Sequence, residues 1–279
     1  VDIDTVTLAG AVGVPVDFPE KECARTHDGN LAALEDVRKL PAPDVLQYKY
    51  INIWLEAVRK LADHFRKEIS VRGNCDQAPF SLASMMRGAQ NWMMDMLDEE
   101  KQEYITELLE YCFEATKQFL TAMAQTGADI LSNGDSVAGP AMISPDMYER
   151  FGLPYEKRII ESVHALGFPY ILHICGNTGP ILQYFPETGT DAMELDYLTD
   201  IDEVYDTLHD SVTLFGNIDP SGILTYGTPE DVRGATRKLL EKYGGCNRFV
   251  LNSGCAIPAT APSENISAMI QTAREYKKK

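Results

Sequence analysis

The segment "SPDMYERFGLPYEKRIIESVHALGFPYILHI" (144–174) places a helix directly before a strand. Ser144 suits the N-cap of a helix and Pro145 its first turn, and the helical pattern stops at Gly167. The run "FPYILHI" (168–174) that follows is short and mostly apolar on both faces, which is typical of a parallel strand covered by helices. The segment therefore predicts one unit of an α/β fold.

The same alternation continues along the whole chain. Strand-like runs are found at 3–8, 68–73, 128–132, 168–174, 191–195, 212–216 and 248–253. Helical patterns are found at 44–65, 98–127, 144–167, 228–245 and 261–276. This order predicts a parallel sheet with right-handed crossovers, and we expect one domain over residues 1–279.

The expected strands are one fewer than a closed eightfold barrel requires. Either one strand is missed, or the chain begins after the first barrel strand. The run at 3–8 favours the second interpretation, because it enters a strand almost at once.

Composition excludes several functional classes. The 279 residues include 25 Lys and Arg against 42 Asp and Glu, a net charge of −17, which disfavours nucleic-acid binding. No apolar run reaches the length of a membrane span, and the N-terminus lacks the features of a signal peptide. The six cysteines are not closely spaced, so we expect a reducing, cytoplasmic setting with free thiols.

Three residues form a candidate metal site. His173 and Cys175 are two positions apart at the end of a strand, so both point to the same face. Cys255 follows another strand, in a loop with Gly254 and Pro258. One imidazole and two thiolates are good zinc ligands that leave a fourth position open, as catalytic zinc requires. The alternative is that these are buried core residues, since free cysteines are often packed as small hydrophobes.

Four segments resemble the uroporphyrinogen decarboxylase superfamily. They are "QAPFSLASMMRG" (77–88), "DSVAGPAMISPDMYERFGLPYEKRI" (135–159), "LFGNIDPSGIL" (214–224) and "LNSGCAIPATAPSENISAMI" (251–270). They occur in the family's order and span nearly the whole chain. The resemblance implies a (β/α)₈ barrel of the TIM type, here lacking its N-terminal strand region.

The superfamily contains metal-free decarboxylases and cobamide-dependent methyltransferases, such as methylcobalamin:coenzyme M methyltransferases. The methyltransferase branch carries a zinc site of the form His-x-Cys…Cys, which His173, Cys175 and Cys255 match. The resemblance thus implies a zinc-dependent enzyme that moves a methyl group between a corrinoid (cobalamin) and a small thiol or methylated substrate. The corrinoid, methylcobalamin in its methylated form, is expected on a separate partner protein.

Two other hypotheses stay open. One is a uroporphyrinogen-type decarboxylase that works without metal. The other is a non-catalytic protein that binds a corrinoid or a metal. The direction of methyl transfer, the substrate and the oligomeric state are not specified by these motifs.

Three further residues are candidates for the site. Asp135 follows a strand and is expected to orient substrate or move a proton, or else to cap a turn. Glu194, at another strand end, is a candidate fourth zinc ligand or proton acceptor, or else a rim carboxylate with ordinary partners. Arg72 is a candidate clamp for an anionic group of the substrate, or else half of a surface ion pair.

Overall fold

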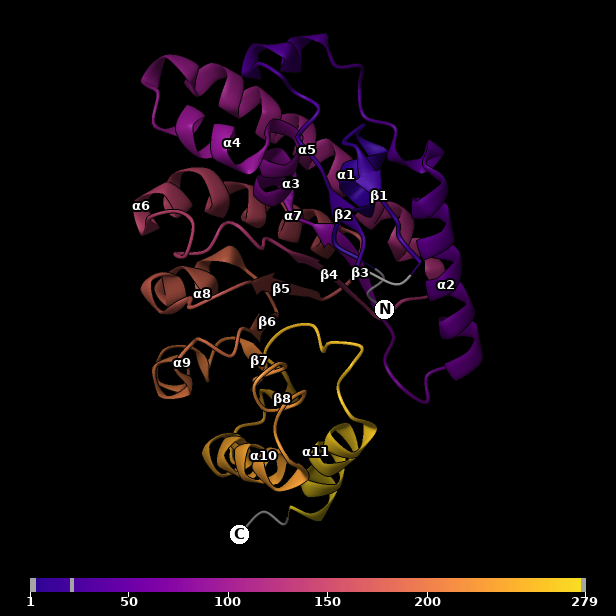
Figure 1. Cartoon of the computed structure of the whole chain (residues 1–279), viewed down its shortest axis with the longest axis vertical. Coiled ribbons are helices and arrows are strands. Elements are labelled where there is room, and N and C mark those ends of the chain that lie inside the picture. Colours follow the sequence, from indigo (N-terminus) through magenta and orange to yellow (C-terminus); the bar gives the residue numbers. More distant parts are fainter. Residues whose placement is uncertain (1–3, 21–22, 277–279) are drawn as a thin grey trace.

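The computed structural model describes residues 4–20 and 23–276, and its centre is a six-stranded parallel sheet. The strands lie side by side in chain order: β3 (Arg72–Gln77), β4 (Ile130–Gly134), β5 (Tyr170–Ile174), β6 (Ala192–Leu195), β7 (Thr213–Ile218) and β8 (Phe249–Ser253). Parallel strands in sequential order, each followed by helix, give the architecture of an α/β barrel of the TIM type. Figure 1 shows the strands at the centre, with helices around them.

Helices connect successive strands. The longer ones are α2 (Lys49–Phe65), α3 (Pro79–Arg87), α4 (Ala89–Met96), α5 (Gln102–Met123), α7 (Leu153–Ala165), α9 (Ile201–Leu208), α10 (Pro229–Tyr243) and α11 (Ser263–Glu275). Short α-helices are α1 (Thr7–Ala11), α6 (Pro145–Met147) and α8 (Phe185–Thr188), and Tyr148–Gly152 forms one π-helical turn. Single 3₁₀ segments lie at Leu34–Lys39, Val45–Gln47, Glu99–Lys101, Ala124–Thr126 and Gly179–Tyr184. β1 (Val16–Asp17) and β2 (Arg25–Thr26) form a separate antiparallel pair.

Side-chain caps fix where several helices begin. The Ser144 hydroxyl accepts a hydrogen bond from Met147 N at 3.2 Å, which confirms the predicted start of the helical segment before β5. Thr228 and Asp231 form a capping box in which each side chain accepts from the other's backbone N–H. These contacts satisfy amide groups that a helix leaves unpaired in its first turn.

The expected strand at 3–8 is wrong over its described residues. The Asp4 carboxylate accepts hydrogen bonds from Val6 N and Thr7 N, at 2.8 and 2.7 Å, and α1 begins at Thr7. Asp4 therefore closes a turn before a helix, although the alternating pattern suggested a strand. Ile3 lies outside the described residues.

The strand expected at 68–73 begins four residues later, at Arg72. α2 ends at Phe65, and Arg66 and Lys67 both adopt positive φ, so the chain is still turning where apolar residues suggested a strand. The true strand has the sequence Arg-Gly-Asn-Cys-Asp-Gln and is largely buried although it is polar. A search for apolar runs does not detect such a strand.

The register of the central strands places the functional side chains. His173 in β5 is paired with Gly134 in β4 and with Glu194 in β6. Asn252 in β8 is paired with Asn217 in β7. These residues lie near the carboxyl ends of their strands, the end at which α/β barrels carry their active sites. No helix in the described part of the chain is long and apolar enough to cross a membrane.

Candidate metal centre

The structure brings the three predicted ligands together. One ligand atom from each of His173, Cys175 and Cys255 lies within 4.8 Å of the other two. His173 Nε2 is 3.2 Å from Cys175 Sγ and 4.0 Å from Cys255 Sγ. The first distance confirms the sequence argument that residues two apart at the end of β5 point to one face.

The orientation of the His173 ring leaves Nε2 available as a ligand atom. His173 Nδ1 lies 2.8 Å from the backbone carbonyl oxygen of Glu194. A carbonyl oxygen only accepts, so Nδ1 carries the proton and donates it, and the lone pair is on Nε2. A hydrogen bond of this kind is the usual companion of a metal-binding histidine.

The two thiols differ in acidity. The pKa of Cys255 is lowered, first because the Cys175 S–H donates to its sulfur and second because the His173 ring, which stabilises the thiolate, lies beside it. The pKa of Cys175 is raised by the same contact with Cys255 and by burial. Burial acts to lower the pKa of His173, but its contacts with Cys255 and the charge of Glu194 raise it overall. Cys255 is therefore the thiol that ionises first.

The donor set fits a zinc ion. Nε2 of a neutral histidine and two cysteine sulfurs are ligands that zinc prefers, and they come from two different strand ends rather than from one helix. Among the described residues no other group of His, Cys, Asp and Glu places its ligand atoms this close together. The other cysteines, at positions 23, 75, 112 and 246, are outside this group.

Arg72 and Glu194 form an ion pair beside the cluster. Arg72 Nη2 is 2.9 Å from Glu194 Oε2, and Arg72 Nε donates to the Ser132 hydroxyl at 2.8 Å. Asn252 Nδ2 donates to the other carboxylate oxygen of Glu194 at 2.7 Å. Burial is the largest single effect and acts to raise the pKa of Glu194, but the charge of Arg72 and the hydrogen bonds from Arg72 and Asn252 together lower it. Glu194 is therefore ionised, and its carboxylate is outside the group of clustered ligand atoms.

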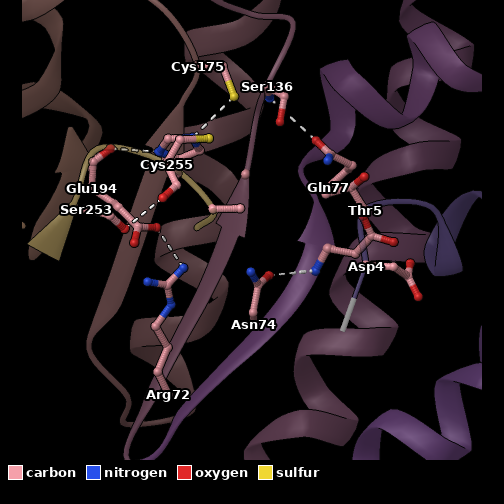
Figure 2. Close-up of a pocket in the computed structure, with 14 residues that line it drawn as sticks. Asp4, Thr5, Arg72, Asn74, Gln77, Ser136, Cys175, Glu194, Ser253 and Cys255 are labelled. Atoms are coloured by element: carbon pink, nitrogen blue, oxygen red, sulfur yellow. Dashed lines mark hydrogen bonds and ion pairs between the residues drawn. The ribbon is translucent and has the colours of Figure 1, made fainter. Parts of the chain in front are cut away.

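A cavity of about 260 Å³ joins these groups. Its charged and polar lining includes Asp4, Arg72, Asp76, Gln77, Ser136 and Glu194, in addition to His173, Cys175 and Cys255. Figure 2 shows Cys175 and Cys255 on one side of this space and Asn74 and Gln77 on the other. A volume slightly below the usual range for small-molecule sites favours a small ligand.

Asp135 lies behind the cavity and does not line it. It is fully buried, and its carboxylate accepts hydrogen bonds from Ser81 N and Ser81 Oγ, at 2.8 and 2.6 Å. Burial raises its pKa to about 6, although the bonds from Ser81 oppose this. Its second neighbour is Glu156, also buried, whose pKa is raised well above its ordinary value by burial and by the charge of Asp135.

One proton is therefore held between two buried carboxyl groups. Glu156 accepts a hydrogen bond from Tyr148 Oη at 2.5 Å. Its other oxygen and Asp135 Oδ2 are buried with no hydrogen-bond partner in the described part of the chain, and a proton between them would satisfy both. Asp135 N in turn donates to the backbone carbonyl of His173 at 2.7 Å, which ties this pair to the strand that carries the metal ligand.

Several residues of the site were missed by reasoning from the sequence. Asn74, Asp76 and Gln77 lie in the polar strand β3, which was expected to lie elsewhere. Asn252 had a usable signal, because it is three residues before Cys255 at the same strand end. Asp4 had none, because its segment was expected to be a strand.

Comparison with known proteins gives these observations a family context. The sequence profile described as uroporphyrinogen decarboxylase (URO-D) matches residues 1–276. The methylcobamide:CoM methyltransferase MtbA of Methanosarcina acetivorans is 33% identical over 244 residues, which is 88% of this chain and 69% of that protein. A uroporphyrinogen decarboxylase of Methylococcus capsulatus is 28% identical over 281 residues, 98% of this chain and 77% of that protein.

A solved structure agrees with the fold. The structure of a methyltransferase from Methanosarcina mazei superposes with a TM-score of 0.87 at 23% identity, covering 97% of this chain and 77% of that one. The sequence profile, the relative at 33% identity and the shared α/β barrel fold lead to one conclusion: this chain belongs to the uroporphyrinogen decarboxylase family.

Proposed function

We propose that the protein is a zinc-dependent methyltransferase that moves a methyl group between a corrinoid and a small thiol or methylated substrate. The observation that carries this proposal is the cluster of His173, Cys175 and Cys255 on the wall of a small cavity. The relatives named methylcobamide:CoM methyltransferases support it, because their names describe methyl transfer between a cobamide and a thiol.

A bound zinc ion would supply Lewis acidity, which lowers the pKa of a coordinated thiol or makes a demethylated group a better leaving group. The chain supplies the neutral Nε2 of His173, held by the Glu194 carbonyl, and a Cys255 sulfur whose pKa is already lowered. Two thiolates also balance the charge of a divalent metal, so the metal with its protein ligands would be formally neutral before substrate binds.

The charged pair beside the cluster suits substrate orientation. Arg72 lines the cavity and is held by Glu194 and Ser132, so its guanidinium is in place to contact an anionic group on a small substrate. Glu194 is a poor proton acceptor because its pKa is lowered. We assign it the role of holding Arg72 and orienting His173 through its backbone carbonyl.

Asp135 is a supporting residue in this proposal. Its full burial and its bonds to Ser81 keep it from contact with the cavity, and its proton is shared with Glu156. Its backbone N–H stabilises the carboxyl end of β5 through the carbonyl of His173.

The corrinoid is proposed to be carried by a separate protein that docks over the carboxyl ends of the strands. The small volume of the cavity favours a small thiol or methylated compound inside it, with the corrinoid presented from outside. The same three ligands would serve methyl transfer to the corrinoid or from it.

The main alternative is a metal-free decarboxylase, which the relatives of that name favour at 28% identity over 98% of the chain. The lining of the cavity argues against it. Among the described residues that line it, the carboxylates of Asp4, Asp76 and Glu194 outnumber the guanidinium of Arg72, so a substrate with several carboxylates would meet more negative than positive charge.

The decisive experiment combines metal analysis with a transfer assay. Purified protein is analysed for zinc and then incubated with methylcobalamin and a small thiol, while demethylation of the corrinoid is followed by its absorbance. Cys255→Ala is compared with Cys246→Ala, because Cys246 contacts the His209 carbonyl and is outside the cavity.

We expect one zinc per chain and corrinoid demethylation in the wild type and in Cys246→Ala, and the loss of both in Cys255→Ala. Decarboxylation of uroporphyrinogen that survives Cys255→Ala would instead establish the decarboxylase. Bound zinc without methyl transfer in either direction would favour the non-catalytic hypothesis.

A further inference from the structure

We propose that the end of β6 and the turn after it, residues 194–199, position all three ligands of the metal centre without supplying any ligand. This inference rests on the proposed function, because it concerns the same metal site. We call residues 194–199 the β6 turn.

The topology explains why the cysteine loops need a contact that fixes their separation. Cys175 follows β5 and Cys255 follows β8, and two other strands, β6 and β7, lie between them. Two loops that are not neighbours in the sheet have no backbone ladder to fix their separation. A tetrahedral site requires that separation to be held closely.

The first ligand is held by the strand itself. The Glu194 carbonyl accepts from His173 Nδ1 at 2.8 Å, which fixes the ring and its tautomer. This contact uses backbone, so the side chain of residue 194 is free to bind Arg72 and Asn252.

The loop of the second ligand is held by two side chains of the turn. Gly176, directly after Cys175, donates its N–H to Asp196 Oδ2 at 2.8 Å. Its carbonyl accepts from the Thr199 hydroxyl at 3.2 Å. Thr199 Oγ1 also accepts from Thr178 N at 3.0 Å, so the turn holds the loop on both sides of Asn177.

The loop of the third ligand is held by backbone contact. Tyr197 N donates to the carbonyl of Gly254, directly before Cys255, at 3.2 Å. The two backbones are so close that a Cβ added at Gly254 would lie 2.4 Å from Tyr197 N and 2.7 Å from Tyr197 Cα. Gly254 N donates to the carbonyl of Ile218 at 2.8 Å, which fixes the other side of this residue.

The turn itself is rigid. Asp196 and Thr199 are 5% and 2% exposed. The second oxygen of Asp196 accepts from Leu198 N at 2.9 Å, and Asn217 Nδ2 donates to the carbonyls of Asp196 and Thr199 at 3.2 and 3.1 Å. A single turn, fixed by these hydrogen bonds and by two buried side chains, therefore contacts both cysteine loops, and this makes it a shared support for the ligands.

The test measures metal affinity and geometry in the full chain, with cobalt(II) as the probe. Asp196→Ala removes the acceptor for Gly176 N and Leu198 N. Asp219→Ala is the matched control, because Asp219 Oδ1 likewise accepts two backbone N–H groups, from Ser221 and Gly222, in the loop after β7. Asp219 does not line the metal cavity.

We expect Asp196→Ala to weaken cobalt binding by about 10- to 100-fold, the usual effect of removing a group that supports metal ligands, and Asp219→Ala to leave it unchanged. The thiolate-to-cobalt absorption should also change in Asp196→Ala, because the Cys175 sulfur moves relative to the metal. Equal affinity and identical spectra in the two variants would overturn the inference.

A second pair of variants covers the case in which Asp196→Ala does not fold. Thr199→Val removes the hydroxyl that holds Gly176 and Thr178 at nearly constant volume, whereas Thr199→Ser keeps a hydroxyl. Weakened cobalt binding in Thr199→Val that is restored in Thr199→Ser supports positioning, and equal binding in both refutes it. A wild-type chain that binds no cobalt or zinc would refute the proposed function itself.

Discussion

Replacing Glu156 with glutamine should make the stability of the protein less dependent on pH. In the native protein, burial and the charge of Asp135 raise the pKa of Glu156 well above its ordinary value. A carboxyl group with a raised native pKa stabilises the fold below its ordinary pKa, and this stabilisation is lost as the pH rises through the native pKa. Glutamine keeps a donor toward Asp135 and an acceptor for Tyr148 Oη, but it has no proton to lose.

The size of the effect follows from proton counting. Between pH 5 and pH 7 the unfolded chain has ionised nearly all of its carboxyl groups, while the native protein retains at least the one proton shared by Asp135 and Glu156. One proton over two pH units corresponds to about 2.7 kcal/mol of unfolding free energy. This equals a change in melting temperature of at least about 5 °C for a chain of this size.

The assay is urea unfolding at pH 5, 6, 7 and 8. Glu110→Gln is the control, because the bond from Arg158 lowers the pKa of Glu110, so its contribution to stability is lost as the pH falls rather than as it rises. The unfolding free energy of Glu156→Gln minus that of wild type should increase by about 2.7 kcal/mol from pH 5 to pH 7. Parallel curves for wild type and Glu156→Gln would show that no proton is held by the buried pair.

Three further predictions concern the cavity. Arg72→Met should raise KM for an anionic substrate about tenfold or more, with a smaller effect on kcat. An unchanged KM in steady-state assays would exclude contact between Arg72 and the anionic group. Asn252→Ala should lower the unfolding free energy by about 1–2 kcal/mol, because one oxygen of the ionised Glu194 loses its partner; urea unfolding at pH 7 measures this. Removing metal with a chelator should expose Cys175 and Cys255 to thiol reagents, and thiol counts that are equal before and after chelation would contradict ligation by these residues.

Local signals predicted much of the fold. Ser144 is followed by proline and caps a helix as expected, and Thr228, also followed by proline, caps the helix that the pattern at 228–245 predicted. The apolar runs that became β5, β6 and β7 were located within two residues, because strands covered on both faces leave a clear apolar signature. The errors at the N-terminal side have a common cause. Asp4 forms a local turn and β3 buries polar groups, and in both places hydrogen bonds rather than apolar burial decide the structure.

The residues of the candidate site likewise include some that the sequence predicts and others that it does not. Residue type and position at strand ends were enough to group His173, Cys175 and Cys255, whereas a zinc site of the methyltransferase type was implied by the family resemblance. The partners of these ligands could not be predicted, because Asp196, Thr199 and Gly254 act through contacts between segments about 20 to 60 residues apart in the chain. Their role depends on which loops the barrel brings together.

The polar character of β3 has a consequence for solubility. In the described part of the chain, β3 has only β4 as a sheet neighbour, but the strand is almost fully buried from Gly73 to Gln77. Its pairing with β4 is irregular between Asn74 and Gln77, and Asp76 adopts a φ of 61°. A bent, charged edge is a poor template for intermolecular strand addition. The buried and irregular end strand therefore offers little regular backbone for edge-to-edge aggregation.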